Sequence, residues 1–176
     1  QLHKCNVEAV RRSPHLSGYH WWLINDYWTT SNGIFDYFFR PKSLKPSDIL
    51  PFNSETALLQ ENLRYSYRAG DSVTFTPSIS HYGKETLSGQ LTYTLTVGDE
   101  TVAEQRARCS GALTGKLTTL ASGSLSCPMV SRPCRATLRI SLSIADSTYS
   151  NSWDTYIFPT RIAPEAEWPI YVDDYA

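Results

Sequence analysis

Apolar and polar residues alternate along most of the chain from about residue 53 onward. The clearest run places Leu138, Ile140, Leu142 and Ile144 on one face, with polar side chains between them. A period of two is typical of strands that bury one face and expose the other. Similar runs occupy residues 73–79, 91–97 and 153–157, with weaker ones at 57–59, 102–107 and 117–125. About seven short strands separated by turn residues predict a mainly β protein, an antiparallel β-sandwich of the immunoglobulin-like type.

The first 45 residues follow a different pattern. Leu2, Cys5 and Ala9 recur at helical spacing, and Pro14 ends this helix. Residues 19–24 are apolar on both faces, which is typical of a parallel strand that is covered on both sides. A helix, a turn and a doubly buried strand make one α-to-β step of an α/β fold, so we expect other residues to complete its sheet.

Proline positions divide the chain further. Residues 40–46 are rich in Pro and Lys and predict a connector, followed by a single helical turn with Ser47 as its cap. Pro77 predicts an edge position or a bulge, because it has no N–H for a central ladder. We therefore expect an α/β fragment at residues 1–45, the sandwich at 46–162, and the start of a further domain or a tail at 163–176. Because both ends look cut, we expect a piece of a longer polypeptide.

Charge and composition argue against several classes of partner. The chain carries 16 basic and 17 acidic side chains without a run of one sign, which argues against nucleic acid. The longest apolar stretch is too short to cross a bilayer, which argues against a membrane partner. The four cysteines lack the spacing of a zinc site, and the lone His20 and His81 predict neither a metal nor a cofactor. Cys127 and Cys134 fit a loop disulfide or two free thiols equally well, and the compartment stays open.

Candidate chemistry is concentrated at the end of the predicted buried strand. Aromatic residues cluster between residues 19 and 39, and Trp22, Asn25, Asp26 and Trp28 lie among them. Sugars pack their C–H faces on aromatic rings, and amide and carboxylate groups hold their hydroxyls, so this mixture indicates a pocket for a small polar ligand. The alternative is that the tryptophans belong to a core and that Asp26 pairs with a backbone group.

Residues 18–28, 33–37 and 40–42 resemble the eighth barrel strand and exit segment of glycoside hydrolase family 2, the β-galactosidase and β-mannosidase relatives. The Trp-X-X-Asn-Asp pattern is most similar to the β-mannosidase-like branch. Residues 67–71 and 78–83 resemble the all-β domain that follows the barrel. The resemblance implies that residues 1–45 are the C-terminal end of a (β/α)8 barrel, and that the parent enzyme hydrolyses β-linked glycosides with retention through two glutamates.

The resemblance also implies a role for each site residue. Trp22 would line the floor of the sugar subsite, and Asn25, Asp26 and Trp28 would shape its mouth. None of the chain's glutamates occupies a catalytic motif position, so we expect no catalytic residue here (Glu8, Glu55, Glu61, Glu85, Glu100, Glu104, Glu165 and Glu167). The expected function is a non-catalytic internal fragment, with the rest of the barrel and a β-glycoside as partners. The alternative is a stand-alone carbohydrate-binding or structural interaction module.

Overall fold

The computed structural model describes residues 2–161, which form two short helices and nine strands. The helices are α1 (Leu2–Arg12) and α2 (Pro46–Ile49). The strands are β1 (Thr56–Glu61), β2 (Ser66–Arg68), β3 (Ser72–His81), β4 (Leu87–Val97), β5 (Glu100–Ala112), β6 (Lys116–Thr119), β7 (Gly123–Ser126), β8 (Cys134–Ile144) and β9 (Ser147–Phe158).

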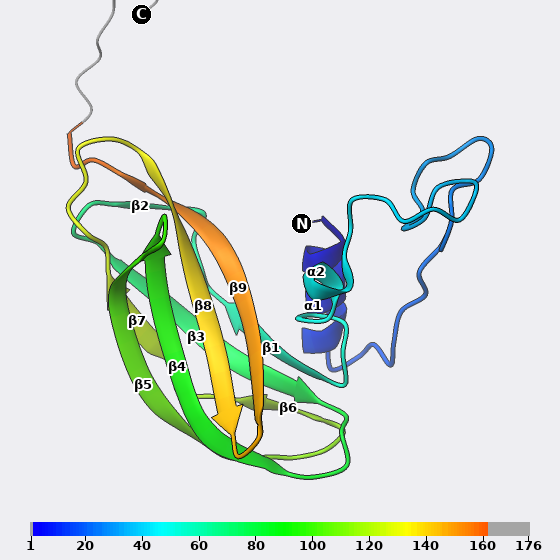
Figure 1. Cartoon of the computed structure of the whole chain (residues 1–176). Helices are drawn as coiled ribbons and strands as arrows, with labels where there is room; N and C mark the ends of the chain where they lie inside the picture. Colours follow the sequence, from blue (N-terminus) through cyan, green and yellow to red (C-terminus); the bar gives the residue numbers. More distant parts are fainter. Residues whose placement is uncertain (1, 162–176) are drawn as a thin grey trace, which may run out of the picture.

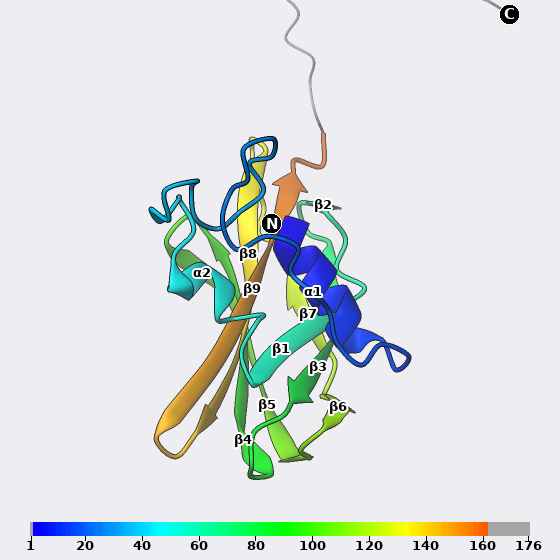
Figure 2. The ribbon, with the colours of Figure 1, turned by 90° about the vertical axis from the view of Figure 1, so that its right-hand side faces the viewer.

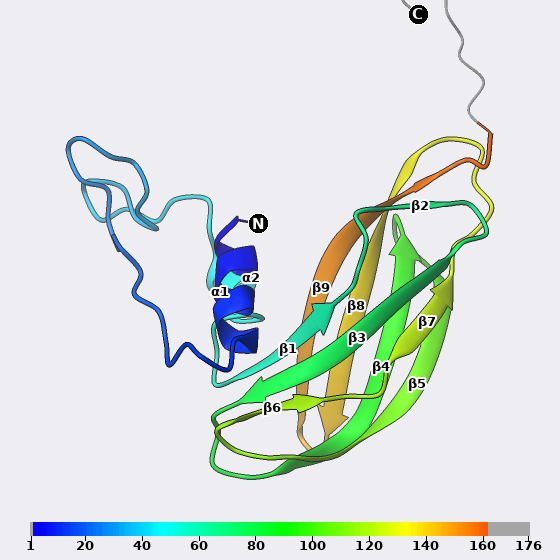
Figure 3. The ribbon, with the colours of Figure 1, turned by 180° about the vertical axis from the view of Figure 1, so that it is seen from behind.

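The strands form two facing sheets (Figures 1 and 3). The smaller sheet has the order β1-β3-β6, and β7 also pairs with β3. The larger sheet has the order β2-β9-β8-β4-β5. The short β2 runs parallel to β9, whereas the other strand pairs are antiparallel. The prediction of a mainly β protein is confirmed, and one of its sheets is mixed.

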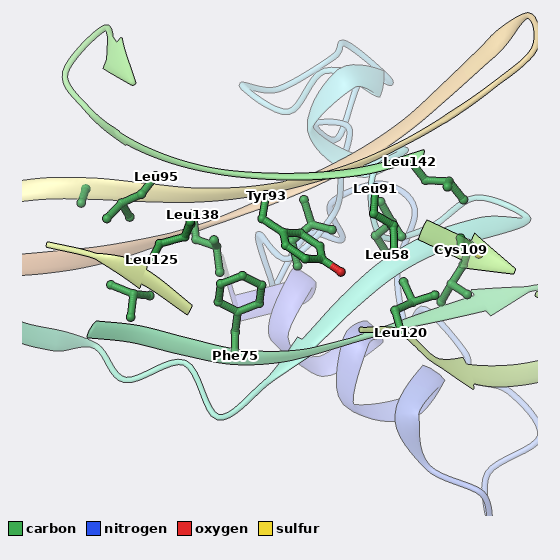
Figure 4. Packing of buried hydrophobic residues seen from close by; sticks show 14 of the residues in the cluster. Leu58, Phe75, Leu91, Tyr93, Leu95, Cys109, Leu120, Leu125, Leu138 and Leu142 are labelled. Atoms are coloured by element: carbon green, nitrogen blue, oxygen red, sulfur yellow. The ribbon is translucent and has the colours of Figure 1, made fainter. Parts of the chain in front are cut away.

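The core lies between the two sheets. Leu138, Ile140 and Leu142 of β8 are fully buried, as are their partners Leu95, Tyr93 and Leu91 on β4, whereas Ile144 is half-buried. Figure 4 shows Phe75 of β3 reaching across to Tyr93, and their rings meet edge to face at 5.1 Å. The Tyr93 hydroxyl donates to the Ala121 carbonyl at 2.6 Å, which satisfies the one polar atom that this ring brings inside.

Pro77 lies in a central strand, so the expectation of an edge or a bulge was wrong. β3 pairs with β1 along one side, and with β7 and then β6 along the other. The β7 pairing spans residues 72–75 and the β6 pairing spans residues 78–81, so Pro77 falls in the interval between them. The Pro77 carbonyl faces that second side, because it accepts from the Leu120 N–H at 2.9 Å. The backbone nitrogen of Pro77, which carries no hydrogen, faces the same interval. No ladder hydrogen bond is made from that nitrogen, so proline fits there.

The N-terminal helix is confirmed, but the buried strand at residues 19–24 was wrong. The segment forms no strand, and isolated bridges such as that between Asn25 and Phe35 join the chain around it. Trp22 is 80% exposed, so this apolar run is not covered on both faces. Within the described residues there is therefore no sign of a barrel fragment. We call residues 19–42 the aromatic arm; in Figures 1 and 3 it projects beyond α1 and α2, away from both sheets.

The helical turn after the connector begins two residues earlier than expected. Lys45 is the N-cap of α2 and Pro46 is its first residue, so Ser47 lies inside the turn and not at its cap. The Lys45 N–H donates to Asp48 Oδ2 at 2.9 Å, which takes the place of the expected serine cap. The predicted strand at 117–125 is two strands, because the buried Leu120 separates β6 from β7. The segment predicted at 163–176 lies outside the described residues.

Candidate binding site on the aromatic arm

Helix α1 is anchored to strand β9 through a buried carboxylate. Glu8 is 4% exposed, and it accepts hydrogen bonds from Asn151 Nδ2 at 2.8 Å and from Trp153 Nε1 at 2.9 Å. Lys4 Nζ lies 3.1 Å from the same carboxylate and also donates to the Ser152 carbonyl. Burial lowers the pKa of Lys4, and the neighbouring Glu8 opposes that change. Figure 2 shows α1 lying along the side of the sandwich that carries β1 and β9.

The last turn of α1 is held by a second set of contacts. Arg11 donates to the Ser54 carbonyl at 2.7 Å and to the Ser80 carbonyl at 3.0 Å. Its burial lowers the pKa of the guanidinium, which nevertheless stays charged because an arginine begins far above neutral pH. Arg12 donates to the Gln60 carbonyl on β1. Both ends of α1, the helix that precedes the arm, are thus fixed to the sandwich.

Asp26 holds the arm closed on itself. Its Oδ1 accepts from the Gly33 N–H at 2.8 Å, and Lys42 Nζ donates to both carboxylate oxygens at 2.9 and 3.0 Å. Lys42 also donates to the Ser31 carbonyl at 2.9 Å. The hydrogen bond from Lys42, supported by that from Gly33, lowers the pKa of the Asp26 carboxyl. A Cβ on residue 33 would lie 2.3 Å from the carbonyl carbon of Asn25, so only glycine fits this approach.

A second turn shapes the distal part of the arm. Asp36 Oδ1 accepts from the backbone N–H groups of Phe38 and Arg40, each at 2.8 Å. Phe39 adopts a positive φ of 61°, which the turn imposes on a residue that disfavours it. The Ile24 carbonyl accepts from the N–H of both Ile34 and Phe35. These bonds place the two sides of the arm next to each other without a regular sheet.

An open hollow of about 730 Å³ lies over β4 and β5, and no aromatic side chain lines it. A second hollow, on the arm, combines aromatic and polar side chains. That arm hollow measures about 550 Å³ and is lined by Asp26, Tyr27, Trp28, Thr29, Thr30, Ser31 and Tyr37. Trp28 is 74% exposed, and its ring lies 5.9 Å from that of Tyr27 at an angle of 58°. Bare aromatic faces beside hydroxyl and carboxylate groups form a surface that a sugar can contact with both its C–H and its O–H groups.

The four residues singled out from the sequence are only partly brought together. Asp26 and Trp28 line the arm hollow, whereas Trp22 and Asn25 do not. Asn25 donates from Nδ2 to the Asp26 carbonyl and so supports the arm backbone. The pairing of Asp26 with the Gly33 N–H matches the alternative in which this carboxylate serves the backbone. Tyr37 is a lining residue that was not predicted from the sequence, although it lies in the aromatic cluster between residues 19 and 39.

Among the described residues the structure shows no cluster that could hold a metal, no disulfide, and no helix that could cross a membrane. Residues 2–161 contain no group of His, Cys, Asp and Glu that could hold a metal ion. All four cysteines are free thiols, which decides the open question of Cys127 and Cys134 for this structure, and burial raises the pKa of Cys127. In the same range, neither helix has the length and apolar character that crossing a bilayer requires.

Comparisons with known proteins place the sandwich in a family. A family model described as "Domain of unknown function (DUF8488)" matches residues 71–159. None of the curated proteins matches the chain. Among solved structures, the crystal structure of Spo0M, a sporulation control protein from Bacillus subtilis, matches at 14% identity and a TM-score of 0.36. The match covers 62% of this chain and 51% of that one, so this chain spans about half the length of the structure it matches.

These findings correct the resemblance to glycoside hydrolase family 2. The family matched over most of the sandwich is DUF8488, and the comparisons give no evidence for a glycoside hydrolase family. The structure agrees, since the segment that suggested a barrel strand forms no strand. The resemblance depended on a short aromatic-rich motif, and such a motif does not by itself show that a sheet surrounds it.

Proposed function

This chain belongs to the DUF8488 family, and we propose that it is a non-catalytic carbohydrate-binding module that uses the hollow on its aromatic arm. The observation that supports this most is the exposed Trp28 ring beside Tyr27 and Tyr37, with Asp26 and three hydroxyl side chains on the same lining. Flat rings supply contact area at a low cost in conformational entropy, and the polar groups orient the sugar.

The electrostatics of the arm hollow favour binding over hydrolysis. Retaining glycoside hydrolysis needs two carboxyl groups about 5 Å apart, one as nucleophile and one as acid and base. Asp26 is the one carboxylate among the described residues that line the hollow. Lys42 and the Gly33 N–H already occupy its oxygens and keep it ionised, so it is a poor general acid. It remains able to accept a hydrogen bond from a sugar hydroxyl.

The sandwich serves in this proposal as the brace of the arm. We infer that it is of the immunoglobulin-like type, because its two sheets enclose one core with apolar residues alternating along β4 and β8. Glu8 and Arg11 fix α1, the helix that precedes the arm, to β9 and to the loop before β1. A rigid base lowers the entropy that a ligand must overcome on binding.

Isothermal titration calorimetry with soluble β-linked gluco-, manno- and galacto-oligosaccharides tests the proposal. We expect saturable binding of at least one of these sugars to the wild-type chain. Trp28→Ala removes the largest exposed ring of the hollow, and we expect it to weaken binding by about tenfold or more, since aromatic anchors contribute over about 1.4 kcal/mol. Tyr65→Ala is the matched control, because Tyr65 is an equally exposed aromatic residue outside the arm (82% exposed).

Two results would contradict the proposal. Absence of heat with every sugar in the panel would leave a structural spacer as the better description of the chain. Equal affinity in the wild type and Trp28→Ala would place any binding elsewhere. Circular dichroism of both variants shows whether the sandwich stays folded, and an unchanged spectrum makes each result interpretable.

A further inference from the structure

A further cavity lies between the two helices and the larger sheet. Its volume is about 320 Å³, near the lower end of the range that small-molecule sites occupy. Its lining residues come from α1, α2, β8 and β9 and the segments around them, together with Trp21 at the start of the arm. Figure 1 shows both helices on the same side of the sandwich, next to β9. No residue lines both this cavity and the arm hollow, so the two are distinct, and we call this one the helix cavity.

Part of the wall of the helix cavity is apolar. Trp21 is half-buried, and the His3 ring stacks on it with 4.4 Å between the ring centroids. Phe52, which is 4% exposed, lines the cavity after α2, and Leu44 lines it before α2. A small apolar group that enters here leaves water and contacts aromatic and aliphatic side chains, which favours its binding.

Arg139 gives the helix cavity an uncommitted cation. It is an exposed residue of β8, and among residues 2–161 no hydrogen bond or ion pair engages its guanidinium. Lys4 also lines the cavity, but an ammonium has three donors, and that of Lys4 already meets three acceptors. These acceptors are Asn151 Oδ1, the Ser152 carbonyl and the Glu8 carboxylate. Arg139 is therefore better placed to bind a ligand, because a guanidinium holds a carboxylate through two parallel hydrogen bonds.

Asp48 gives the same cavity an anion with a free oxygen. Its Oδ2 accepts from the Lys45 N–H at 2.9 Å, whereas no described residue donates to its Oδ1. No ion pair joins Asp48 to Arg139, although both residues line the helix cavity. A ligand that carries one charge of each sign can therefore supply both missing partners at once.

We propose that the helix cavity binds a free α-amino acid with an apolar side chain. The carboxylate of the ligand accepts from Arg139, its ammonium donates to Asp48 Oδ1, and its side chain packs against Trp21 and Phe52. A simple carboxylic acid would leave Asp48 without a partner, and a simple amine would leave Arg139 without one, so the zwitterion fits this lining better than either. Binding does not depend on the sugar site, because the cavity and the arm hollow share no residue.

Titration of the full chain with L-leucine, followed through the indole N–H signal of Trp21 in a ¹⁵N–¹H spectrum, measures this binding. We expect a saturable shift. Two probes share the hydrocarbon body of leucine but lack one charge: 4-methylpentanoate has no ammonium, and 3-methylbutylamine has no carboxylate. We expect each probe to bind at least about tenfold more weakly than leucine, because each leaves one charged side chain of the cavity unpaired.

Variants assign the two charges of the ligand to their partners. Asp48→Asn keeps an acceptor for the Lys45 N–H but removes the negative charge, so leucine and 4-methylpentanoate should then bind alike. Arg139→Gln should weaken leucine binding by about tenfold or more. Arg108→Gln is the matched control, because Arg108 is also an exposed arginine of the larger sheet but lies on β5, outside the helix cavity, and this variant should bind leucine like the wild type.

Three outcomes would overturn the proposal. The first is a Trp21 signal that leucine does not move at millimolar concentration. The second is a wild-type chain that binds 4-methylpentanoate as tightly as leucine, which would make the cavity a simple anion site. The third is an unchanged affinity for leucine in both Arg139→Gln and Asp48→Asn, which would place binding elsewhere. If a variant loses its far-UV circular dichroism, the comparison of the three probes on the wild type decides alone.

Discussion

Glu8 is the residue whose removal most directly tests how α1 holds the arm. Its carboxylate is buried and receives three donors, from Lys4, Asn151 and Trp153. Glu8→Ala removes the acceptor and leaves these donors in place. Asn151 Nδ2 keeps the Leu58 carbonyl at 2.7 Å and Lys4 Nζ keeps the Ser152 carbonyl at 2.7 Å, so the Trp153 indole N–H loses most.

The magnitude follows from the Trp153 indole N–H, which is left without an acceptor, and from Lys4, which loses its carboxylate partner. A buried donor left without a partner costs about 1–3 kcal/mol, and removing one member of a buried ion pair costs about 3–5 kcal/mol. The Lys4 side chain is 18% exposed and can turn partly toward water, which places the effect at the lower end. We expect the opening free energy of the α1 amides to fall by about 3 kcal/mol, or about a hundredfold in protection from exchange.

Hydrogen exchange followed by mass spectrometry on peptides from α1 measures this loss directly. Glu61→Ala is the matched control, because Glu61 also pairs with a residue of α1 (Arg12, at 3.6 Å) but is 53% exposed. An exposed pair contributes about 0–1 kcal/mol, so exchange of α1 should hardly change in the control. If Glu8→Ala and Glu61→Ala gave the same protection as the wild type, the buried carboxylate would not be what anchors α1.

Two further predictions concern titrations. The pKa of Asp26 should lie below its ordinary value of 3.8, because Lys42 and Gly33 stabilise the ionised carboxylate. The stability that this contact gives the arm is therefore complete above pH 3.8, and it is lost as the pH falls through the lowered pKa of Asp26. A carboxyl NMR titration checks this, and Lys42→Met should return the pKa of Asp26 toward 3.8. Burial raises the pKa of Tyr93 to about 12, so the stabilising neutral phenol persists below pH 10 and is lost as pH rises toward 12. Ultraviolet absorbance should show a late phenolate step that Tyr93→Phe abolishes.

The sandwich could be predicted because its strands bury one face each. Leu138, Ile140 and Leu142 alternate with polar residues in the sequence, and all three are fully buried in the structure. The pattern is sufficient there, since a strand with one wet face looks the same in sequence wherever the strand lies. The short β2 was missed because three residues with one buried side chain, Tyr67, give too little periodicity.

The exposed conformation of the arm could not be predicted from its sequence. Whether an apolar segment is buried on both faces depends on which other elements pack against it, and the pattern of apolar residues does not show those elements. Residues 19–24 carry apolar side chains on both faces, a pattern that a doubly covered strand and an exposed arm share equally. The candidate site was half right for the same reason. Asp26 and Trp28 line the hollow, whereas Trp22 does not, and the hydrogen bonds that fold the arm join residues up to sixteen positions apart.

Sugar binding at the arm hollow is the central claim, and the indole N–H signals of the five tryptophans test it most directly. In a two-dimensional ¹⁵N–¹H spectrum titrated with the oligosaccharide panel, the Trp28 signal should shift in a saturable way. The Trp153 signal should stay fixed, because that indole donates to the buried Glu8. A titration that leaves Trp28 unmoved with every sugar, or that moves Trp153 instead, would contradict a carbohydrate site on the aromatic arm.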